Sequence, residues 1–192
     1  MEVRVSDRGT RMITGFEAVV THVYKDQASI DTVCVGHVVR PEDHAWIDDG
    51  VTLEECDRVL HQDLASVERE ISTLVTVPLT QDQVDALASW EFNCGGLRKS
   101  TLLVKLNQGD YDGAANEFVR WNKRWDKKLG KLVVDTGLTA RREAEANLFR
   151  RGITASGDVP DPVWQDFVNR TLAKLFDLYD PMAYRQDEQE GA

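Results

Sequence analysis

Paired signals for long helices constrain the fold of this chain more than any other feature of its sequence. A capping box, formed by Thr52 and Glu55, precedes a stretch in which apolar residues recur at helical spacing up to about Leu74. In such a box the two side chains satisfy backbone N–H groups that a helix start leaves without partners. The apolar positions are Leu53, Cys56, Val59, Leu60, Leu64, Val67 and Ile71. This spacing predicts one long amphipathic helix with a buried face.

A second capping box, Thr80 with Gln83, predicts another core helix. Its apolar positions are Val84, Leu87, Ala88 and Phe92. Glycine favours the left-handed backbone that closes many helices, so we expect this helix to stop at Gly95–Gly96. We expect further helices over Ser100–Asn107, Asp110–Trp121 and Thr139–Arg151, each closed by glycine or a basic loop. The larger part of the chain is therefore predicted to be a helical lobe.

The first forty residues change from helical to strand character. Apolar residues recur at i, i+3, i+4 and i+7 from Met12 to Val23, which predicts a helix over roughly Ser6–Val23 that contains Glu17. From Tyr24 to about Val39 the β-branched residues of TVCVGHVV predict a short hairpin or small sheet. The expected fold class is α+β, mostly α, with a small β-lobe beside a larger helical lobe.

The chain of 192 residues suits one domain with a short appendage. We assign residues 1–152 to the main domain and residues 153–192 to a linker, an extra C-terminal helix and a disordered tail. The linker has the composition TASGDVPDPV, and an amphipathic helix is expected from Pro162 to about Tyr179. We expect this helix to pack on the helical lobe through Trp164, Phe167 and Phe176. We do not expect it to be a module that binds the cell wall.

Composition and the N-terminal sequence bound the class of protein. Hydrophobic residues make up 42% and charged residues 29%, which excludes a disordered or fibrous chain. There is no run of 18 apolar residues, and the start MEVRVSDRGTRM lacks the hydrophobic stretch of a signal sequence. We therefore expect no membrane anchor. A substrate outside the cytoplasmic membrane would require a pore-forming partner or a delivery machine.

The three cysteines, Cys34, Cys56 and Cys94, are an odd number at unrelated spacings. Such a set matches neither a disulfide framework nor a zinc site. We interpret all three as reduced, buried thiols.

Glu17 and Asp26 are suitable for the hydrolysis of a glycosidic bond. This reaction needs a protonated acid beside the leaving oxygen and a second group that stabilises positive charge or activates water. Glu17 is placed late in an apolar helix beside Phe16, a setting that suits a general acid, and Asp26 lies in a polar KDQ turn. Many pairs of acidic residues would meet this description. Glu17 could equally belong to a helix-start capping box with Thr14, Asp26 could simply form a turn, and Thr32 could be an ordinary strand residue.

The wider pattern is more specific. The spacing of four features resembles the glycoside hydrolase family 24 lysozymes found in many phages. Eight residues separate Glu17 from Asp26, five separate Asp26 from Thr32, and Gly36–His37 follows. Later segments resemble this family in the same order over about residues 6–152. They are LHQDL, VPLTQDQVDAL, FNCG, STLLVKLNQGDYDGAANEF, Trp121 and GLTARREAEANLF.

The resemblance implies a lysozyme-like fold and a peptidoglycan muramidase that causes lysis of a bacterial host. Glu17 would be the general acid, and Asp26 and Thr32 would hold the attacking water in an inverting reaction. The bond cut would be the β-1,4 bond between N-acetylmuramic acid and N-acetylglucosamine. No cofactor or metal is expected. The expected partners are peptidoglycan glycan strands and a holin or delivery machine, not nucleic acid, for a monomer made in the host cytoplasm that acts in the periplasm or cell wall.

Two further sets of residues fall on family positions. His37 and Asp63 are expected to form a structural pair between the β-lobe and the long helix. Catalysis or metal binding by His37 is the weaker interpretation. Arg141 and Arg142 are interpreted as helix-surface arginines near the edge of the core.

Three positions depart from the family pattern. Ala18 and Cys34 stand where glycine is usual, and Asp31 stands where an aromatic residue often precedes the threonine. We expect Cys34 to crowd the cleft, because glycine lets a backbone approach sugar or turn sharply. Asp31 would add a second carboxylate near Asp26. These changes leave open a non-catalytic protein that binds glycan or a virion partner, and a muramidase toxin secreted by bacteria is a further alternative.

Charge is distributed unevenly along a chain whose net charge is −10. Residues 1–96 carry a net charge of −11, residues 97–152 carry +6 and residues 153–192 carry −5. The basic segment RWNKRWDKKLGK could face an anionic polymer, such as peptidoglycan or nucleic acid, or could be a solvated lysine-rich loop. Both interpretations stay open.

Overall fold

The computed structural model describes residues 3–26, 29–48 and 50–154. The chain divides into two compact units, Met1–Ser156 and Gly157–Ala192, and only the first contains described residues. The predicted linker was wrong at its first two residues, because Ile153 and Thr154 are helical, and the remainder of the linker, the C-terminal helix and the tail lie outside the described residues. None of the described helices is long and apolar enough to cross a membrane.

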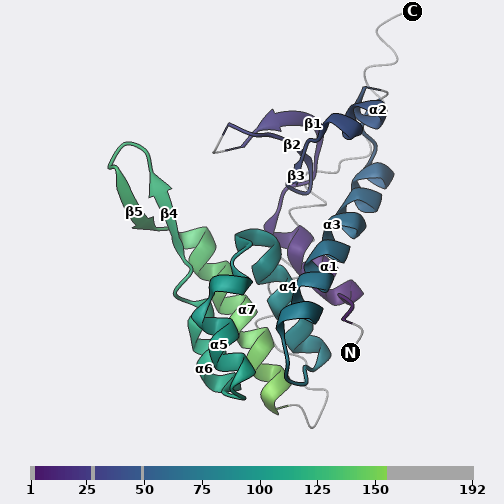
Figure 1. The fold of residues 1–192 in the computed structure, drawn as a ribbon. Coiled ribbons are helices and arrows are strands. Elements are labelled where there is room, and N and C mark those ends of the chain that lie inside the picture. Colours follow the sequence, from purple (N-terminus) through teal and green to yellow (C-terminus); the bar gives the residue numbers. More distant parts are fainter. Residues whose placement is uncertain (1–2, 27–28, 49, 155–192) are drawn as a thin grey trace, which may run out of the picture. The chain divides into compact units, whose positions relative to one another are not determined.

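A bundle of helices forms the larger part of the described unit (Figure 1). Its elements are α3 (Leu53–Leu74), α4 (Gln81–Cys94), α5 (Thr101–Asn107), α6 (Tyr111–Phe118) and α7 (Thr136–Thr154), with a 3-10 turn η2 (Leu97–Lys99). Helix α4 contacts α7, α1 and α3, and every residue from Gln83 to Glu91 is buried. The helical lobe therefore has α4 at its centre, and the predicted mostly helical class is confirmed.

Both predicted capping boxes are present. Thr52 Oγ1 accepts a hydrogen bond from Glu55 N at 3.1 Å, and Thr52 N donates to Glu55 Oε2 at 2.9 Å. The same reciprocal arrangement joins Thr80 and Gln83. At the other end of α4, Gly95 has φ 58°, the left-handed conformation that favours glycine. Local sequence signals thus decided where the two core helices begin and where α4 ends.

The prediction of a helix over Ser6–Val23 was wrong in its second half. Helix α1 covers Asp7–Phe16, and the side chain of Ser6 caps its start by accepting from Gly9 N. The chain then becomes extended and enters strand β1 (Val20–Lys25). Val23 is 38% exposed, so its place in the apolar rhythm did not mark a buried helical face. The β-branched residues of this segment favour a strand once the chain leaves the helix.

The predicted small β-lobe is confirmed. Strand β1 pairs with β2 (Asp31–Cys34), and β2 pairs with β3 (His37–Val38), both antiparallel. A 3-10 turn η1 (Pro41–Asp43) and a short helix α2 (His44–Ile47) lead from this sheet to α3. Buried Val33 and Cys34 pack with Cys56 of α3, so one face of the sheet lies against the long helix.

The basic segment after α6 is a hairpin rather than a loop or part of a helix. Strands β4 (Lys123–Asp126) and β5 (Lys131–Val134) pair antiparallel as a separate two-stranded sheet. Helix α6 ends at Phe118, before the predicted Trp121, and α7 begins at Thr136, before the predicted Thr139. The many lysines of this segment hid the alternation of apolar residues in it.

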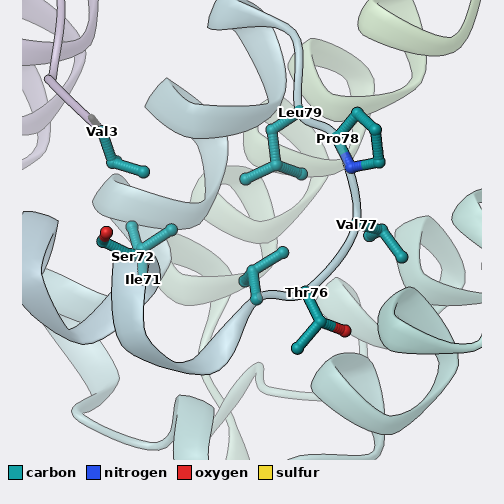
Figure 2. Close-up of a pocket in the computed structure, with 8 residues that line it drawn as sticks. Val3, Ile71, Ser72, Thr76, Val77, Pro78 and Leu79 are labelled. Carbon is teal, nitrogen blue, oxygen red and sulfur yellow. The ribbon is translucent and has the colours of Figure 1, made fainter. Parts of the chain in front are cut away.

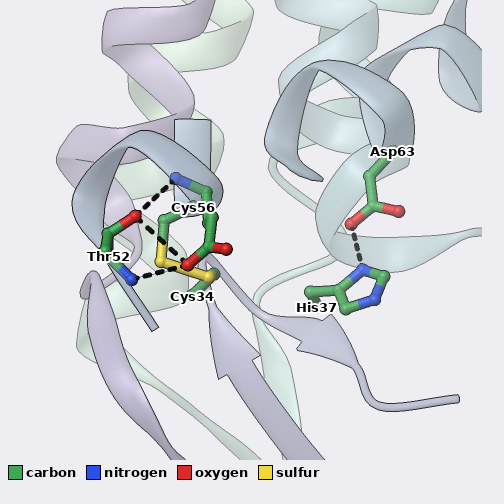
Figure 3. The surroundings of a disulfide bond; sticks show 6 residues. Cys34, His37, Thr52, Cys56 and Asp63 are labelled. Atoms are coloured by element: carbon green, nitrogen blue, oxygen red, sulfur yellow. Dashed lines mark hydrogen bonds and ion pairs between the residues drawn. A yellow bond between two sulfur atoms is a disulfide. The ribbon is translucent and has the colours of Figure 1, made fainter. Parts of the chain in front are cut away.

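The interpretation of all three cysteines as reduced thiols was wrong. Cys34 of β2 and Cys56 of α3 form a disulfide across a sequence separation of 22, and Cys94 is free (Figure 3). Both bonded residues are buried. Counting cysteines could not show that β2 packs on α3, which brings these two together. The bond links the β-lobe covalently to the long helix.

Candidate active site

Glu17 lies at the junction of α1 and β1. It is the C-cap residue of α1, and its backbone N–H donates to the carbonyl of Ile13 at 3.2 Å. Its side chain is 26% exposed. The carboxylate is thus attached to a helix end that is packed through Met12 and Ile13, both fully buried. A rigid helix therefore sets its position, although Glu17 is not inside the helix as predicted.

Asp26 directly follows β1, and its side chain organises the turn there. Its Oδ1 accepts a hydrogen bond from Ile30 N at 2.8 Å, and its backbone N–H donates to Ile30 O at 2.9 Å. The turn-forming role that the sequence allowed is therefore real. It also fixes the carboxylate at the end of the strand.

Thr32 lies on β2 with only 3% of its surface exposed. Its hydroxyl donates to the carbonyl of Ile30 at 3.1 Å. Its cross-strand partner on β1 is Tyr24. A hydroxyl that donates to a fixed carbonyl turns its lone pairs in a defined direction, where it can accept a hydrogen bond.

Tyr24 connects the three predicted residues. Burial raises the pKa of Tyr24, and the negative charges of Glu17 and Asp26 raise this pKa further. Both carboxylates therefore act electrostatically on the Tyr24 hydroxyl, while Thr32 is the partner of Tyr24 on the neighbouring strand. Tyr24, which the sequence analysis missed, is thus linked to Glu17 and Asp26 through their charges and to Thr32 through strand pairing. Its position on the strand that ends at Asp26 was the available signal.

Arg141 of α7 binds Glu17 from the helical lobe. Its Nη1 donates to Glu17 Oε1, and its guanidinium lies 5.1 Å from the centre of the Phe16 ring. Further donors reach Ser89 O at 3.0 Å and Glu145 Oε1 at 3.1 Å. The interpretation of Arg141 as a helix-surface residue was wrong, because α7 packs on α4 and leaves it only 3% exposed.

A second buried arginine extends this network. Arg142 is fully buried and donates to Asn93 Oδ1 at 2.8 Å and to Cys94 Sγ at 2.9 Å. Its Nε lies 3.1 Å from Glu145 Oε2. Burial raises the pKa of Glu145, and the charges of the two arginines and a hydrogen bond from Ser89 oppose this rise. The surface interpretation was therefore wrong for Arg142 as well, because a buried acid on the same helix compensates both cations.

His37 joins three elements at the edge of the β-lobe. Its Nδ1 lies 2.8 Å from Asp63 Oδ2 of α3, which confirms the predicted pair (Figure 3), and its Nε2 lies 3.0 Å from Asp43 Oδ2 of η1. Burial alone would raise the pKa of Asp43, but hydrogen bonds from His37, the Arg40 backbone and Trp46 outweigh it, so this pKa is lowered. We name this set, His37 with Asp43 and Asp63, the histidine clamp. Sequence analysis missed Asp43.

The described unit contains cavities that differ in their lining. One, of about 400 Å³, lies between the β-lobe and the helical lobe and is lined by Gly36, Val38 and His37 on one side and by Glu91, Phe92 and Gly95 of the α4 end on another. Burial raises the pKa of Glu91, whose Oε2 accepts from Leu97 N at 2.8 Å. Glu17, Asp26 and Thr32 do not line this cavity.

Another cavity, of about 280 Å³, lies at the connection between α3 and α4 (Figure 2). Its lining is mainly apolar, from Val3, Ile71 and residues 75–79. No side chain in this lining titrates near neutral pH, so it offers no acid or base. Among the described residues, no group of three or more His, Cys, Asp or Glu side chains is placed to hold a metal ion.

The structure also locates the departures from the family pattern. Cys34 has φ 57°, the conformation for which glycine is usual, and its side chain is fully buried in the disulfide. It therefore does not crowd a cleft as expected. Asp31 pairs with Lys25 on the neighbouring strand at 2.7 Å. Ala18 is exposed between α1 and β1.

The chain is similar to several phage endolysins. The family model described as phage lysozyme matches residues 14–145. The endolysin of Acyrthosiphon pisum secondary endosymbiont phage 1 is 38% identical over 149 residues, which cover 77% of this chain and 98% of that protein. The SAR-endolysin of Escherichia phage Mu is 41% identical over 133 residues, covering 64% and 72%. The solved endolysin from Escherichia coli O157:H7 phage FAHEc1 superposes with a TM-score of 0.66 at 27% identity, covering 84% and 99%.

Proposed function

The chain belongs to the phage lysozyme family, and we propose that Glu17, Asp26 and Thr32 are its catalytic residues. It is a lysozyme, a glycoside hydrolase that degrades peptidoglycan and lyses the bacterial host cell. The observation that carries the proposed site is the strand pairing, because Thr32 lies opposite Tyr24 on β1, and the two ends of β1 adjoin Glu17 and Asp26.

Glu17 is the general acid in this proposal. It protonates the oxygen of the β-1,4 bond between N-acetylmuramic acid and N-acetylglucosamine as that bond breaks. Its attachment to the end of α1 and its contact with Arg141 support this role. A catalytic acid must have its carboxyl group held in one orientation relative to the bond that it protonates. Arg141 acts as a positioning residue, since it contacts Glu17 and is itself held by Ser89 and Glu145.

Asp26 and Thr32 hold the attacking water. The hydroxyl of Thr32 donates to Ile30 O and can accept a hydrogen bond from water, while the Asp26 carboxylate takes the proton that the water loses. Attack from the face opposite the leaving group inverts the configuration at the sugar carbon. This mechanism requires the two carboxyl groups to stand roughly 6.5–9.5 Å apart, which leaves room for the water.

The test is the release of reducing ends from purified peptidoglycan. Glu17→Gln should lower the rate roughly 10²–10⁴-fold, the usual contribution of general acid catalysis. Glu143→Gln is the matched control, because it makes the same change at an exposed position of α7. Unchanged turnover by the Glu17 variant would exclude the acid assignment, and wild-type binding of peptidoglycan without turnover would favour a non-catalytic glycan-binding protein.

Asp26→Asn and Thr32→Val test the water-holding pair in the same assay. Both should lower the maximal rate more than they change KM, because they act on water rather than on sugar. The first product should carry the α configuration at its new reducing end, as nuclear magnetic resonance can observe during the reaction. A first product in the β configuration would mean retention and would contradict the water-holding roles.

Delivery and assembly complete the proposal. The protein is made in the host cytoplasm, acts as a monomer on glycan strands in the periplasm or cell wall, and reaches them through a holin or another delivery machine. The SAR-endolysin name of the phage Mu relative supports a route that leads out of the cytoplasm. Analytical ultracentrifugation and lysis with and without a co-expressed holin test these two statements separately.

A further inference from the structure

The hairpin β4–β5 carries the most exposed apolar side chains of the part of the chain that the structure describes. The exposed fractions are 58% for Trp125, 60% for Leu129, 59% for Leu132 and 61% for Val134. The next most exposed large apolar residue in that part is Val104, at 55%. Scattered apolar residues are ordinary on protein surfaces, but four on one short hairpin are a candidate contact surface.

The strand register gathers three of these side chains on one face. Trp125 pairs with Leu132, and Lys123 pairs with Val134. Side chains two residues apart on a strand point to the same side, and cross-strand partners share that side. Trp125, Leu132 and Val134 therefore form one apolar face, with the ammonium of Lys123 at its margin.

The fourth side chain is held at the tip. The carboxylate of Asp126 accepts hydrogen bonds from Lys128 N at 2.8 Å and Leu129 N at 3.0 Å. Gly130 has φ 59° and donates its N–H to Asp126 O at 2.8 Å. The turn is thus closed by its own hydrogen bonds, and Leu129 needs little additional ordering when it meets a partner.

The hairpin that carries the apolar face is strongly basic. Residues 120–134 contain six Lys or Arg and one acidic residue, within a chain whose net charge is −10. The acidic residue is Asp126, whose carboxylate serves the turn. A basic hairpin on an acidic protein selects an anionic partner, because the remainder of the molecule repels such a partner.

The base of the hairpin is fixed to the start of α7, beyond which the strands project (Figure 1). Arg124 Nε donates to Asp135 Oδ2 at 2.9 Å, and Asn122 Nδ2 donates to Thr139 Oγ1 at 3.2 Å. The Asp135 carboxylate accepts hydrogen bonds from the Leu138 N–H and from Arg124, which lower the pKa of Asp135, so Asp135 stays ionised and keeps the base of the hairpin closed at neutral pH. The projecting part of the hairpin can therefore contact a partner while its base stays attached to the helical lobe.

From these observations we infer that the hairpin β4–β5 binds the surface of a bilayer rich in anionic phospholipid. Trp125, Leu129 and Leu132 lie at the boundary between headgroups and acyl chains, Lys123 and Lys128 contact phosphates, and Lys131, on the other face of the hairpin, adds to the attraction. Aliphatic side chains next to tryptophan and lysine suit this boundary. Sugars and carboxylates offer nothing that Leu129 or Leu132 could bury, so a glycan surface fits less well. The inference does not depend on the catalytic roles proposed above.

Sedimentation of the full chain with lipid vesicles tests this inference. Vesicles of phosphatidylethanolamine with phosphatidylglycerol should bind the protein, and vesicles of phosphatidylcholine alone should not. Changing Lys123, Lys128 and Lys131 together to Gln should weaken binding on the order of 100-fold, given the attraction of each basic residue to an anionic surface. Leu129→Asn with Leu132→Asn should weaken it at least about tenfold.

Matched controls come from other exposed positions. Val104→Asn and Lys99→Gln alter similar side chains away from the hairpin and should leave vesicle binding unchanged. Turnover of isolated peptidoglycan and the thermal midpoint should stay at wild-type values in the hairpin variants. Equal binding to both kinds of vesicle, or vesicle binding that survives the hairpin changes, overturns the inference. Loss of binding to isolated peptidoglycan without any binding to vesicles overturns it too and assigns the hairpin to the glycan.

Discussion

The two small sheets of this molecule are built from similar strand residues but are held in different ways. In the sheet β1–β3, Val33 and Cys34 are fully buried, and the disulfide and the histidine clamp tie the sheet to α3. In the hairpin β4–β5, Trp125 and Leu132 are more than half exposed, and polar contacts at the base hold the strands. Among the described residues, cross-links are thus found in the sheet that carries the proposed catalytic residue Thr32, and not in the hairpin proposed as a contact surface.

Of the changes that test this contrast between the two sheets, removal of the disulfide should lower the free energy of unfolding the most. Changing Cys34 and Cys56 together to Ala should lower the free energy of unfolding by about 3 kcal/mol, as expected for a loop of this length. Urea denaturation measures the change, and peptidoglycan turnover should fall with it because Thr32 lies on the same strand. The variant Cys34→Gly with Cys56→Ala should recover about 1 kcal/mol, since glycine suits the positive φ at position 34.

If the Gly-containing variant is no more stable than the Ala-containing one, the backbone conformation at position 34 carries no cost. If both double variants equal the wild type, the disulfide does not stabilise the β-lobe. Either result would weaken the contrast between the two sheets.

Breaking the histidine clamp should have the next largest effect. His37→Ala leaves the carboxylates of Asp43 and Asp63 facing each other without the imidazole, which should lower the free energy of unfolding by about 2 kcal/mol. His61→Ala serves as the control, because His61 is 62% exposed on α3 and makes only local contacts. Urea denaturation measures both variants. Equal losses of the free energy of unfolding would show that the histidine clamp does not stabilise the fold.

The clamp also predicts a pH dependence. The pKa of Asp43 is lowered in the folded protein, so its contribution is fully present above the unfolded value of about 3.9 and is lost as pH falls through the folded value. The urea midpoint should therefore drop below about pH 4, and Asp43→Asn should flatten part of this drop. Asp48→Asn, at an exposed position, is the control. A steeper drop in the Asp43 variant would mean that the sign is wrong.

The smallest effect is expected at the hairpin. Leu132→Asn and Trp125→Phe should change the free energy of unfolding by no more than about 0.5 kcal/mol, because exposed side chains away from packed contacts contribute little. The same urea series measures this. A loss comparable with that of the disulfide variant would show that the hairpin is packed in solution and would contradict its role as a free surface.

Local signals explain the parts of the fold that were predicted correctly. The capping boxes at Thr52 and Thr80 and the glycine at position 95 act within one helical turn, so their meaning does not depend on distant residues. Strand propensity likewise predicted the β-lobe. The end of α1 was missed, because Val19 and Val20 satisfy a helical rhythm and a strand preference equally well, and only packing decided between the two.

The parts that were missed depend on contacts between distant segments. Cys34 and Cys56 meet because β2 packs on α3, and Arg141 meets Glu17 because α7 packs on α4. Sequence separation and residue type carry no information about such meetings. The hairpin β4–β5 was missed for a different reason: its lysines are what a solvated loop would also contain.

By itself the sequence determined the helical core and the small β-lobe and led to the proposal of Glu17, Asp26 and Thr32 as site residues, because spacing, capping and family pattern are properties of a linear chain. Only the tertiary structure decided the disulfide, the buried partners of Arg141 and the surroundings of Tyr24, which arise when separate elements pack. It also decided that the apolar face of the hairpin stays exposed. Burial is a property of the whole fold, and the same leucine or tryptophan is core or contact surface according to what lies over it.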